Sequence, residues 1–147
     1  MKREISAGVI VYRRDAATHE ILFLVMHYIS GHWDFAKGKL EGEETRKDAA
    51  LRELQEETGI EHVQLQPGFE QSLSYIFRDR KGDMVEKEVT FFLGETNTEK
   101  VVLSREHLYS KWLPYKDASK QLTYANARQI LAQANRILQT HEARETI

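Results

Sequence analysis

The chain has no cysteine among its 147 residues and no large excess of charge of either sign. The first absence excludes a disulfide framework and a zinc site built from thiolates. Lys and Arg total 21 against 23 for Asp and Glu, a formal net charge of -2, so the chain as a whole does not attract the phosphate backbone of long nucleic acids. Any basic site must therefore be local.

Long apolar runs are missing as well. The first apolar stretch ends at Arg13 and Arg14, which makes it too short for the core of a signal peptide or for a membrane span. No internal repeat, low-complexity linker or second domain boundary is visible. With 41% hydrophobic and 30% charged residues, the composition is that of an ordinary globular domain. We therefore expect one domain covering residues 1–147, located in the cytoplasm.

The apolar pattern predicts the order strand, strand, helix, several strands, helix. Strands are expected at 5–12, 21–28, 63–66, 69–78, 85–96 and 108–113, with a loop at 31–42. One long amphipathic helix is predicted over 116–140, because apolar residues recur there at spacings of three and four, and the polar tail 141–147 is expected to fray. This order favours an α+β fold of the α/β/α sandwich type, with a mixed β-sheet between helices.

The helix over residues 45–58 has the clearest boundaries in the chain. Thr45 and Asp48 resemble a capping box, in which each residue bonds the backbone N–H of the other. Four apolar residues between positions 49 and 54 supply a buried face, and Gly59 is typical of a helix stop. This helix carries the residues that point to chemistry.

Glu53, Glu56 and Glu57 fall within a sector of roughly 100° on one face of that helix. Carboxylates three and four residues apart repel one another, and anions in the last turn oppose the helix dipole. A hard divalent cation such as Mg²⁺ or Mn²⁺ reverses both effects, because it binds carboxylate oxygens and can be shared with substrate phosphates. The alternative is that the three glutamates form only a solvated helix face.

The surrounding spacing favours the metal site. Seven glycine, glutamate and arginine residues stand at fixed offsets between positions 38 and 60, with aliphatic residues at 54 and 60: Gly38, Glu44, Arg52, Glu53, Glu56, Glu57 and Gly59. This stretch resembles the complete Nudix box. The resemblance implies the Nudix fold, with a loop-helix-loop over 38–60 that binds Mg²⁺ through Glu53, Glu56 and Glu57.

The resemblance also implies roles for the residues around these ligands. The Gly38 carbonyl is expected as an additional metal ligand, and Glu44 with Arg52 as a supporting pair that holds the loop and orients the ligands. Metal-bound water would attack a phosphorus atom of a diphosphate linkage while a carboxylate accepts a proton. The candidates for that general base are Glu53, Glu57 and Glu106.

Several short pieces outside the box are similar to the asymmetric dinucleoside tetraphosphate hydrolases, the Nudix group that splits diadenosine tetraphosphate into ATP and AMP. By position, this likeness implies that His32, Lys37 and Lys87 contact phosphates, that Tyr75 stacks on an adenine, and that Glu106 assists the metal site or the water. The alternative is that Tyr75 is a core residue, Lys87 only an exposed strand residue and His32 a packing residue of the loop.

Two departures from this group concern the substrate contacts. Ala36 and Lys39 replace the group's usual proline and histidine, and we count Lys39 with the substrate-binding candidates. The second stacking tyrosine is expected four residues after Glu106, where this chain has Ser110. Tyr109 is one position early, on the opposite face of a strand unless a bulge restores it, and it is the candidate for that role.

The expected partner is a nucleotide or dinucleoside polyphosphate, with no long nucleic acid and no membrane, and the chain is expected to act as a monomer or homodimer. One alternative keeps the enzyme but changes the substrate to a nucleoside triphosphate, a modified dNTP or the 5′ end of RNA, for which Arg78, Arg80 and Lys81 offer a local basic patch. The other is a Nudix module that binds a nucleotide without hydrolysing it. The chain has lost none of the metal ligands of the box, which favours an enzyme.

Overall fold

The structure is a computed structural model that describes residues 1–145. Its elements follow the predicted order of strands and helices. They are β1 (Lys2–Arg14), β2 (Ile21–Tyr28), β3 (Trp33–Asp34), β4 (Ala36–Lys39), α1 (Arg46–Thr58), β5 (Gln64–Arg78), β6 (Met84–Glu95), β7 (His107–Leu113), α2 (Tyr115–Gln121) and α3 (Ala125–Glu145).

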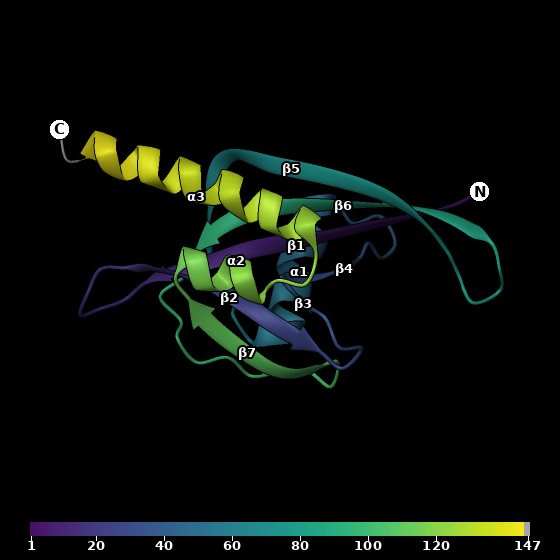
Figure 1. Cartoon of the computed structure of the whole chain (residues 1–147), viewed down its shortest axis with the longest axis horizontal. Helices are drawn as coiled ribbons and strands as arrows, with labels where there is room; N and C mark the ends of the chain where they lie inside the picture. Colours follow the sequence, from purple (N-terminus) through teal and green to yellow (C-terminus); the bar gives the residue numbers. More distant parts are fainter. Residues whose placement is uncertain (146–147) are drawn as a thin grey trace.

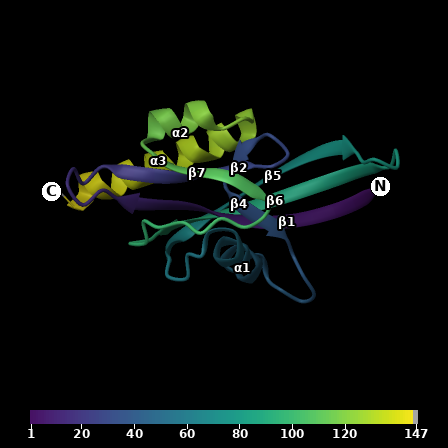
Figure 2. The same cartoon turned by 90° about the horizontal axis from the view of Figure 1, so that it is seen from below.

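The strands form one mixed sheet between two layers of helices. The strand order is β3-β2-β1-β6-β5, with β4 also paired to β1 and β7 also paired to β2. β1 and β6 run parallel, whereas the other pairs are antiparallel. Helix α1 covers one face of the sheet, and α2 and α3 cover the other (Figures 1 and 2). This arrangement confirms the predicted α/β/α sandwich.

Each face of the sheet has its own apolar core, because neighbouring residues of a strand point to opposite faces. Ile10 and Phe23 pack in the cluster beneath α2 and α3. Val9 and Leu24, each on the other face of its strand, pack with Leu54 of α1. The central strands are therefore buried on both sides, as their continuous apolar sequences indicate.

Helix α1 begins and ends at the predicted signals. The hydroxyl of Thr45 accepts a hydrogen bond from the Asp48 backbone N–H at 3.1 Å, and the Asp48 carboxylate accepts one from the Thr45 N–H at 3.4 Å. Gly59 takes a left-handed conformation with φ 78° and closes the helix by donating its N–H to the carbonyl of Gln55. The metal-site candidates of the box therefore lie on a helix with fixed ends.

The prediction of one helix over 116–140 is wrong, because the segment 122–124 separates α2 from α3. Leu122 is extended, with ψ 132°. Thr123 hydrogen-bonds β3 instead, accepting from the Trp33 N–H at 2.8 Å and donating its own N–H to the Trp33 carbonyl. Arg128 donates to the carbonyls of Leu122 and Thr123 and closes the break. The spacing of apolar residues could not predict this break, because the helical spacing continues on both sides of it.

The tail prediction also needs correction, because α3 continues to Glu145, and only residues 146–147 of the predicted tail lie outside the described range. The side chain of Glu142 forms an ion pair with Arg14, which fastens this part of α3 to β1. Among the described residues, no helix is long and apolar enough to cross a membrane.

Two strand predictions differ in detail. Segments 63–66 and 69–78 form the single strand β5, which is interrupted by a register shift between Leu65 and Glu70. The loop at 31–42 contains the short strands β3 and β4. β4 lies unusually close to β1, since a Cβ placed on Gly8 would meet the Ala36 carbonyl oxygen at 2.3 Å. The absence of a side chain at Gly8 therefore allows β4 to pair closely with β1, beside α1.

Candidate active site

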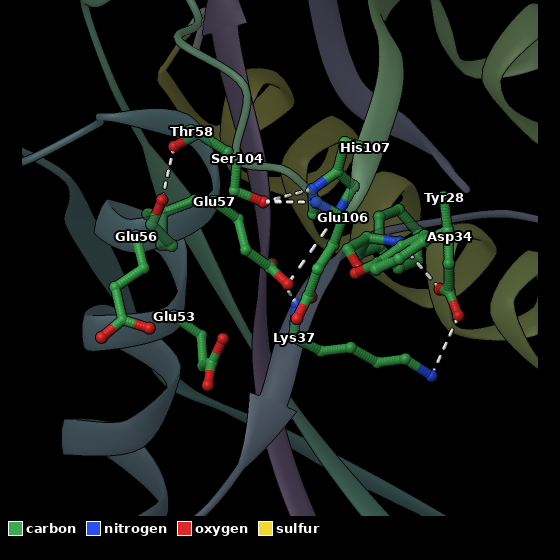
Figure 3. Close-up of polar contacts among 12 residues, drawn as sticks. Tyr28, Asp34, Lys37, Glu53, Glu56, Glu57, Thr58, Ser104, Glu106 and His107 are labelled. Atoms are coloured by element: carbon green, nitrogen blue, oxygen red, sulfur yellow. Dashed lines mark hydrogen bonds and ion pairs between the residues drawn. The ribbon is translucent and has the colours of Figure 1, made fainter. Parts of the chain in front are cut away.

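Glu57 lies at the inner end of the site, where α1 meets β4 (Figure 3). The residue is only 2% exposed, and its Oε2 accepts a hydrogen bond from the Lys37 backbone N–H at 2.9 Å. Its Oε1 is buried and has no hydrogen-bond partner among the described residues. Burial, followed by the negative charge of Glu53, raises the pKa of Glu57 to about 9. A carboxylate in this position requires a positive partner in order to be charged at neutral pH.

Glu53 lies one helical turn away from Glu57 and against β4. A Cβ placed on Gly38 would fall 2.1 Å from the carboxyl carbon of Glu53, so only glycine at this position leaves room for that carboxylate. Burial is the main cause that raises the pKa of Glu53, and the charges of Glu56 and Glu106 act in the same direction. The predicted ligand Gly38 thus lies directly against the predicted ligand Glu53.

Arg52 ties the outer part of the site together. Its guanidinium donates two hydrogen bonds to Glu44, at 2.7 and 3.0 Å, and a third to the Lys39 carbonyl at 3.0 Å. It also contacts Glu53 at 3.0 Å and Glu56 at 3.1 Å. The hydrogen bonds from Arg52 lower the pKa of Glu44. These contacts are those expected of a supporting pair that fixes the loop to the helix.

The three predicted ligands on α1 do not form a ready-made cluster. No group of three or more acidic, histidine or cysteine side chains is arranged for a metal within the range that the structure describes. The Glu56 side chain is 57% exposed and is paired with Arg52. Arg52, four residues earlier on the same helix face, supplies the positive charge beside this glutamate. Glu53 and Glu57 remain beside each other, with Glu106 near enough to raise the pKa of both.

A cavity of about 800 Å³ opens in front of these glutamates, on the side of the sheet that carries α3. It collects eight residues that the sequence analysis had named as site candidates. They are His32, Lys37, Gly38, Lys39, Glu53, Tyr75, Lys87 and Glu106. The volume lies within the range of small-molecule sites.

Three lysines give the cavity its positive charge. Lys37 forms an ion pair with Asp34 at 3.0 Å, and Lys39 with Glu4 at 3.1 Å. Burial, followed by the charge of Lys37, lowers the pKa of Lys87. Lys87 is therefore not merely an exposed strand residue. The lysine ammonium groups are suited to bind the phosphate oxygens of a ligand in the cavity.

His32 has both a packing contact and a place in the cavity. Its ring stacks on Tyr28 with the centroids 4.7 Å apart, and its Nδ1 lies 2.8 Å from the Ser30 hydroxyl. Burial is the main cause that lowers the pKa of His32. The two alternatives considered for this histidine, packing and ligand contact, are thus compatible.

Tyr109 does not line the cavity. It pairs with His27 across β7 and β2 and stacks on the His27 ring, with centroids 5.9 Å apart, while 62% of the residue stays exposed. A register shift between these strands lies at His27 and Tyr28, next to Tyr109, and with this shift Tyr109 is still outside the cavity. The placement of Tyr109 in the substrate site is therefore not supported.

Tyr124 is a second exposed tyrosine in the lining of the cavity. It stands in the break before α3, lines the cavity together with Tyr75, and is 53% exposed. Its ring lies 5.7 Å from that of His32. The sequence analysis missed Tyr124 because it placed this residue inside a continuous helix. The pair Thr123-Tyr124 directly before the small residues of 125–127 was the available signal for a helix start.

His107 lies behind Glu57 and away from the solvent. Its side chain is 0% exposed, its Nδ1 lies 2.9 Å from the Ser104 hydroxyl, and its Nε2 lies 3.9 Å from Oε1 of Glu57. The Tyr28 ring packs on it at 4.2 Å, and the Tyr28 hydroxyl donates to the Phe35 carbonyl. Burial lowers the pKa of His107 to about 4. The sequence analysis gave this histidine no role.

The NUDIX domain family profile matches residues 2–134, which include the cavity, α1 and the loop before it. The chain belongs to the Nudix family. Among similar proteins, the asymmetrical bis(5′-nucleosyl)-tetraphosphatase of Caenorhabditis elegans is 35% identical over 127 residues, covering 86% of this chain and 90% of the relative. The mouse protein of the same name is 32% identical over 143 residues, covering 90% and 94%.

The fold of this Nudix protein agrees with solved structures. A C. elegans Ap4A hydrolase in a binary complex superposes with a TM-score of 0.82 at 30% identity, covering 93% of this chain and 98% of the other. The likeness to the asymmetrical tetraphosphatases, inferred from short sequence pieces, is thereby confirmed. This Nudix chain is a hydrolase that acts on phosphoric anhydride bonds.

Proposed function

We propose that the chain is a Mg²⁺-dependent hydrolase that cleaves diadenosine tetraphosphate into ATP and AMP. One observation carries the proposal: a single cavity joins two accessible tyrosine rings to three lysines and then to Glu53 and Glu106. An adenine, a polyphosphate and a hydrolytic centre need groups of these three kinds. The similarity to the asymmetrical tetraphosphatases supports the same substrate.

The residues present fit a divalent cation. Glu57 has one buried oxygen to which no residue of the described range donates a hydrogen bond, and the Glu53 carboxylate occupies the space that a side chain at position 38 would fill. The donors are carboxylate and carbonyl oxygens, which Mg²⁺ and Mn²⁺ prefer. Glu53, Glu56 and Glu57, with the Gly38 carbonyl, would hold the cation. When bound, it supplies charge neutralisation for the polyphosphate and lowers the pKa of a water molecule.

The chain's own residues perform the remaining tasks. Tyr75 and Tyr124 hold a base between the sheet and α3, and Lys37 and Lys87 hold the phosphates in the cavity. Glu106 is the base that this arrangement favours, because it lines the cavity, whereas Glu57 is buried behind it and already accepts a hydrogen bond from the Lys37 N–H. Arg52 and Glu44 keep the loop and helix in register.

The substrate and the point of attack are tested together by hydrolysis of diadenosine tetraphosphate in H₂¹⁸O. We expect ATP and AMP as products, with the label in AMP alone, because water then attacks the outermost phosphorus on that side. Nucleoside triphosphates, modified dNTPs and a 5′-triphosphate RNA are assayed at the same concentration. Faster turnover of any of these substrates would contradict the proposed specificity, and binding without turnover of any would indicate a non-catalytic module.

The aromatic part of the cavity gives a prediction of its own. Tyr124→Ala should raise KM for diadenosine tetraphosphate roughly 10-fold, because stacking a base on an aromatic ring stabilises binding by about 1 to 3 kcal/mol. Tyr124→Phe should retain most of the affinity. Tyr109→Ala removes an equally exposed ring outside the cavity and serves as the matched control. Equal KM values for Tyr124→Ala and Tyr109→Ala would show that Tyr124 does not contact the base.

A further inference from the structure

His107, the first residue of β7, is enclosed beside Glu57 (Figure 3). Its imidazole lies under the ring of Tyr28 and has no exposed side-chain surface. It does not line the cavity, so it does not contact a nucleotide bound there. Any effect of His107 on the reaction must therefore pass through the residues that it touches.

The hydrogen bonds around Ser104 fit the tautomer of this imidazole that carries its proton on Nε2. The backbone N–H of Glu106 donates to the Ser104 Oγ at 3.3 Å, which leaves the hydroxyl proton of Ser104 free to bond the Nδ1 of His107 at 2.9 Å. When Nδ1 accepts, the ring proton of a neutral imidazole is on Nε2. The donor of His107 therefore faces α1.

Nε2 of His107 points at Oε1 of Glu57, 3.9 Å away. Both atoms are buried, and neither has a hydrogen-bond partner in the described part of the chain. Leaving a buried donor and a buried acceptor unpaired is unfavourable. A shift of roughly 1 Å would bring the two atoms to hydrogen-bond distance, and catalytic hydrogen bonds often shorten in this way on ligand binding.

We propose that His107 is a positioning residue that donates its Nε2–H to Glu57 and holds this buried carboxylate in its working orientation. Both oxygens of Glu57 are then fixed from the strand side, Oε2 by the Lys37 N–H and Oε1 by His107. The same hydrogen-bond chain runs through Ser104 to the backbone of Glu106, so it links the loop carrying the favoured base to the helix carrying the metal ligands. This inference rests on the proposed metal-dependent function.

Substitutions at position 107 separate positioning from packing. His107→Gln can place an amide N–H near the position of Nε2, whereas His107→Leu fills the space without a donor. Titration calorimetry with Mn²⁺ alone should show binding weakened roughly 10-fold or more in the leucine variant, the usual effect of losing a residue that orients a metal ligand, with the glutamine variant within about 3-fold of the unaltered protein. With diadenosine tetraphosphate, kcat should fall in His107→Leu while KM stays unchanged.

Serine substitutions provide a second test that leaves the imidazole in place. Ser104→Ala removes the hydroxyl that bonds Nδ1 of His107 and should weaken Mn²⁺ binding, though less than His107→Leu. Ser72→Ala is the matched control, since it removes a partly buried hydroxyl bonded at 2.7 Å to Thr90 and lies outside the cavity. We expect this control to bind Mn²⁺ as the unaltered protein does. Circular dichroism and thermal melts establish that each variant is folded.

Three results would overturn the inference. The first is unchanged Mn²⁺ binding in a folded His107→Leu variant, and the second is equal weakening in the glutamine and leucine variants. If His107→Leu does not fold, unchanged binding in Ser104→Ala would be the decisive contrary result. Failure of the unaltered protein to bind Mn²⁺ would instead refute the proposed function, and this inference with it.

Discussion

Replacing Glu57 with glutamine is expected to remove nearly all hydrolytic activity while making the metal-free protein more stable. Activity should fall by several orders of magnitude, because the amide cannot provide the charge that holds a divalent cation in this place. Stability should rise because Glu57 is 2% exposed and its Oε1 accepts no hydrogen bond within the part of the chain that the structure describes, so the ionised carboxylate is unfavourable in the fold. The Glu57 carboxylate therefore lowers the stability of the metal-free protein, although the reaction requires it.

The sign of the pH dependence follows from the raised pKa of Glu57. The folded protein holds the proton up to a pKa of about 9, against 4.5 for an unperturbed glutamate. The proton therefore stabilises the folded state fully below pH 4.5, and this contribution is lost as the pH rises toward 9. The advantage of Glu57→Gln should thus be small near pH 5 and should increase toward pH 8.

The melting temperatures of both proteins are measured in EDTA at pH 5 and at pH 8. At pH 8 we expect Glu57→Gln to melt about 3 to 10 °C higher than the unaltered protein, the shift produced by a few kcal/mol in a chain of this length. Glu56→Gln is the control for stability, because its side chain is 57% exposed and a surface substitution should shift the stability little. An equal or lower melting temperature for Glu57→Gln at pH 8 would show that the buried carboxylate has a partner that compensates its charge.

The limits of α1 and the positions of its glutamates could be predicted from the sequence, because both depend on local rules. Thr45, Asp48 and Gly59 act over three or four residues, and the box spacing fixes which side chains share a helix face. The local rules do not predict that the Glu57 side chain points inward and the Glu56 side chain points outward. These orientations depend on β4 and on Arg52, which reach these side chains only in the folded chain.

The parts of the site that the sequence analysis missed come from distant segments. Tyr124 enters the cavity because Thr123 bonds Trp33, a residue 90 positions earlier, and so interrupts a pattern that continues as a helix on both sides. His107 faces Glu57 because β7 pairs with β2, which no local signal specifies. Tyr109 was chosen because it stands next to the expected position, but in the fold it stacks on His27 outside the cavity.

Gly38→Ala is expected to remove most of the activity with little change in stability. The added Cβ would lie 2.1 to 2.5 Å from the three carboxyl atoms of Glu53. These atoms form the far end of a flexible side chain, so the clash can be relieved by rotation of Glu53 rather than by movement of the backbone. Glu53 then leaves its place against position 38, and the predicted metal site loses this carboxylate ligand.

Gly8→Ala is the matched comparison, because its Cβ would meet the Ala36 carbonyl oxygen at 2.3 Å, which is backbone and cannot rotate away. We expect Gly8→Ala to lower the melting temperature strongly, and Gly38→Ala to lower kcat by roughly 100-fold or more at a nearly unchanged melting temperature. Mn²⁺ titration should show weakened binding in Gly38→Ala. If Gly38→Ala instead kept normal turnover, the Glu53 carboxylate would not need its place against β4, and the ligand set proposed for this site would be wrong.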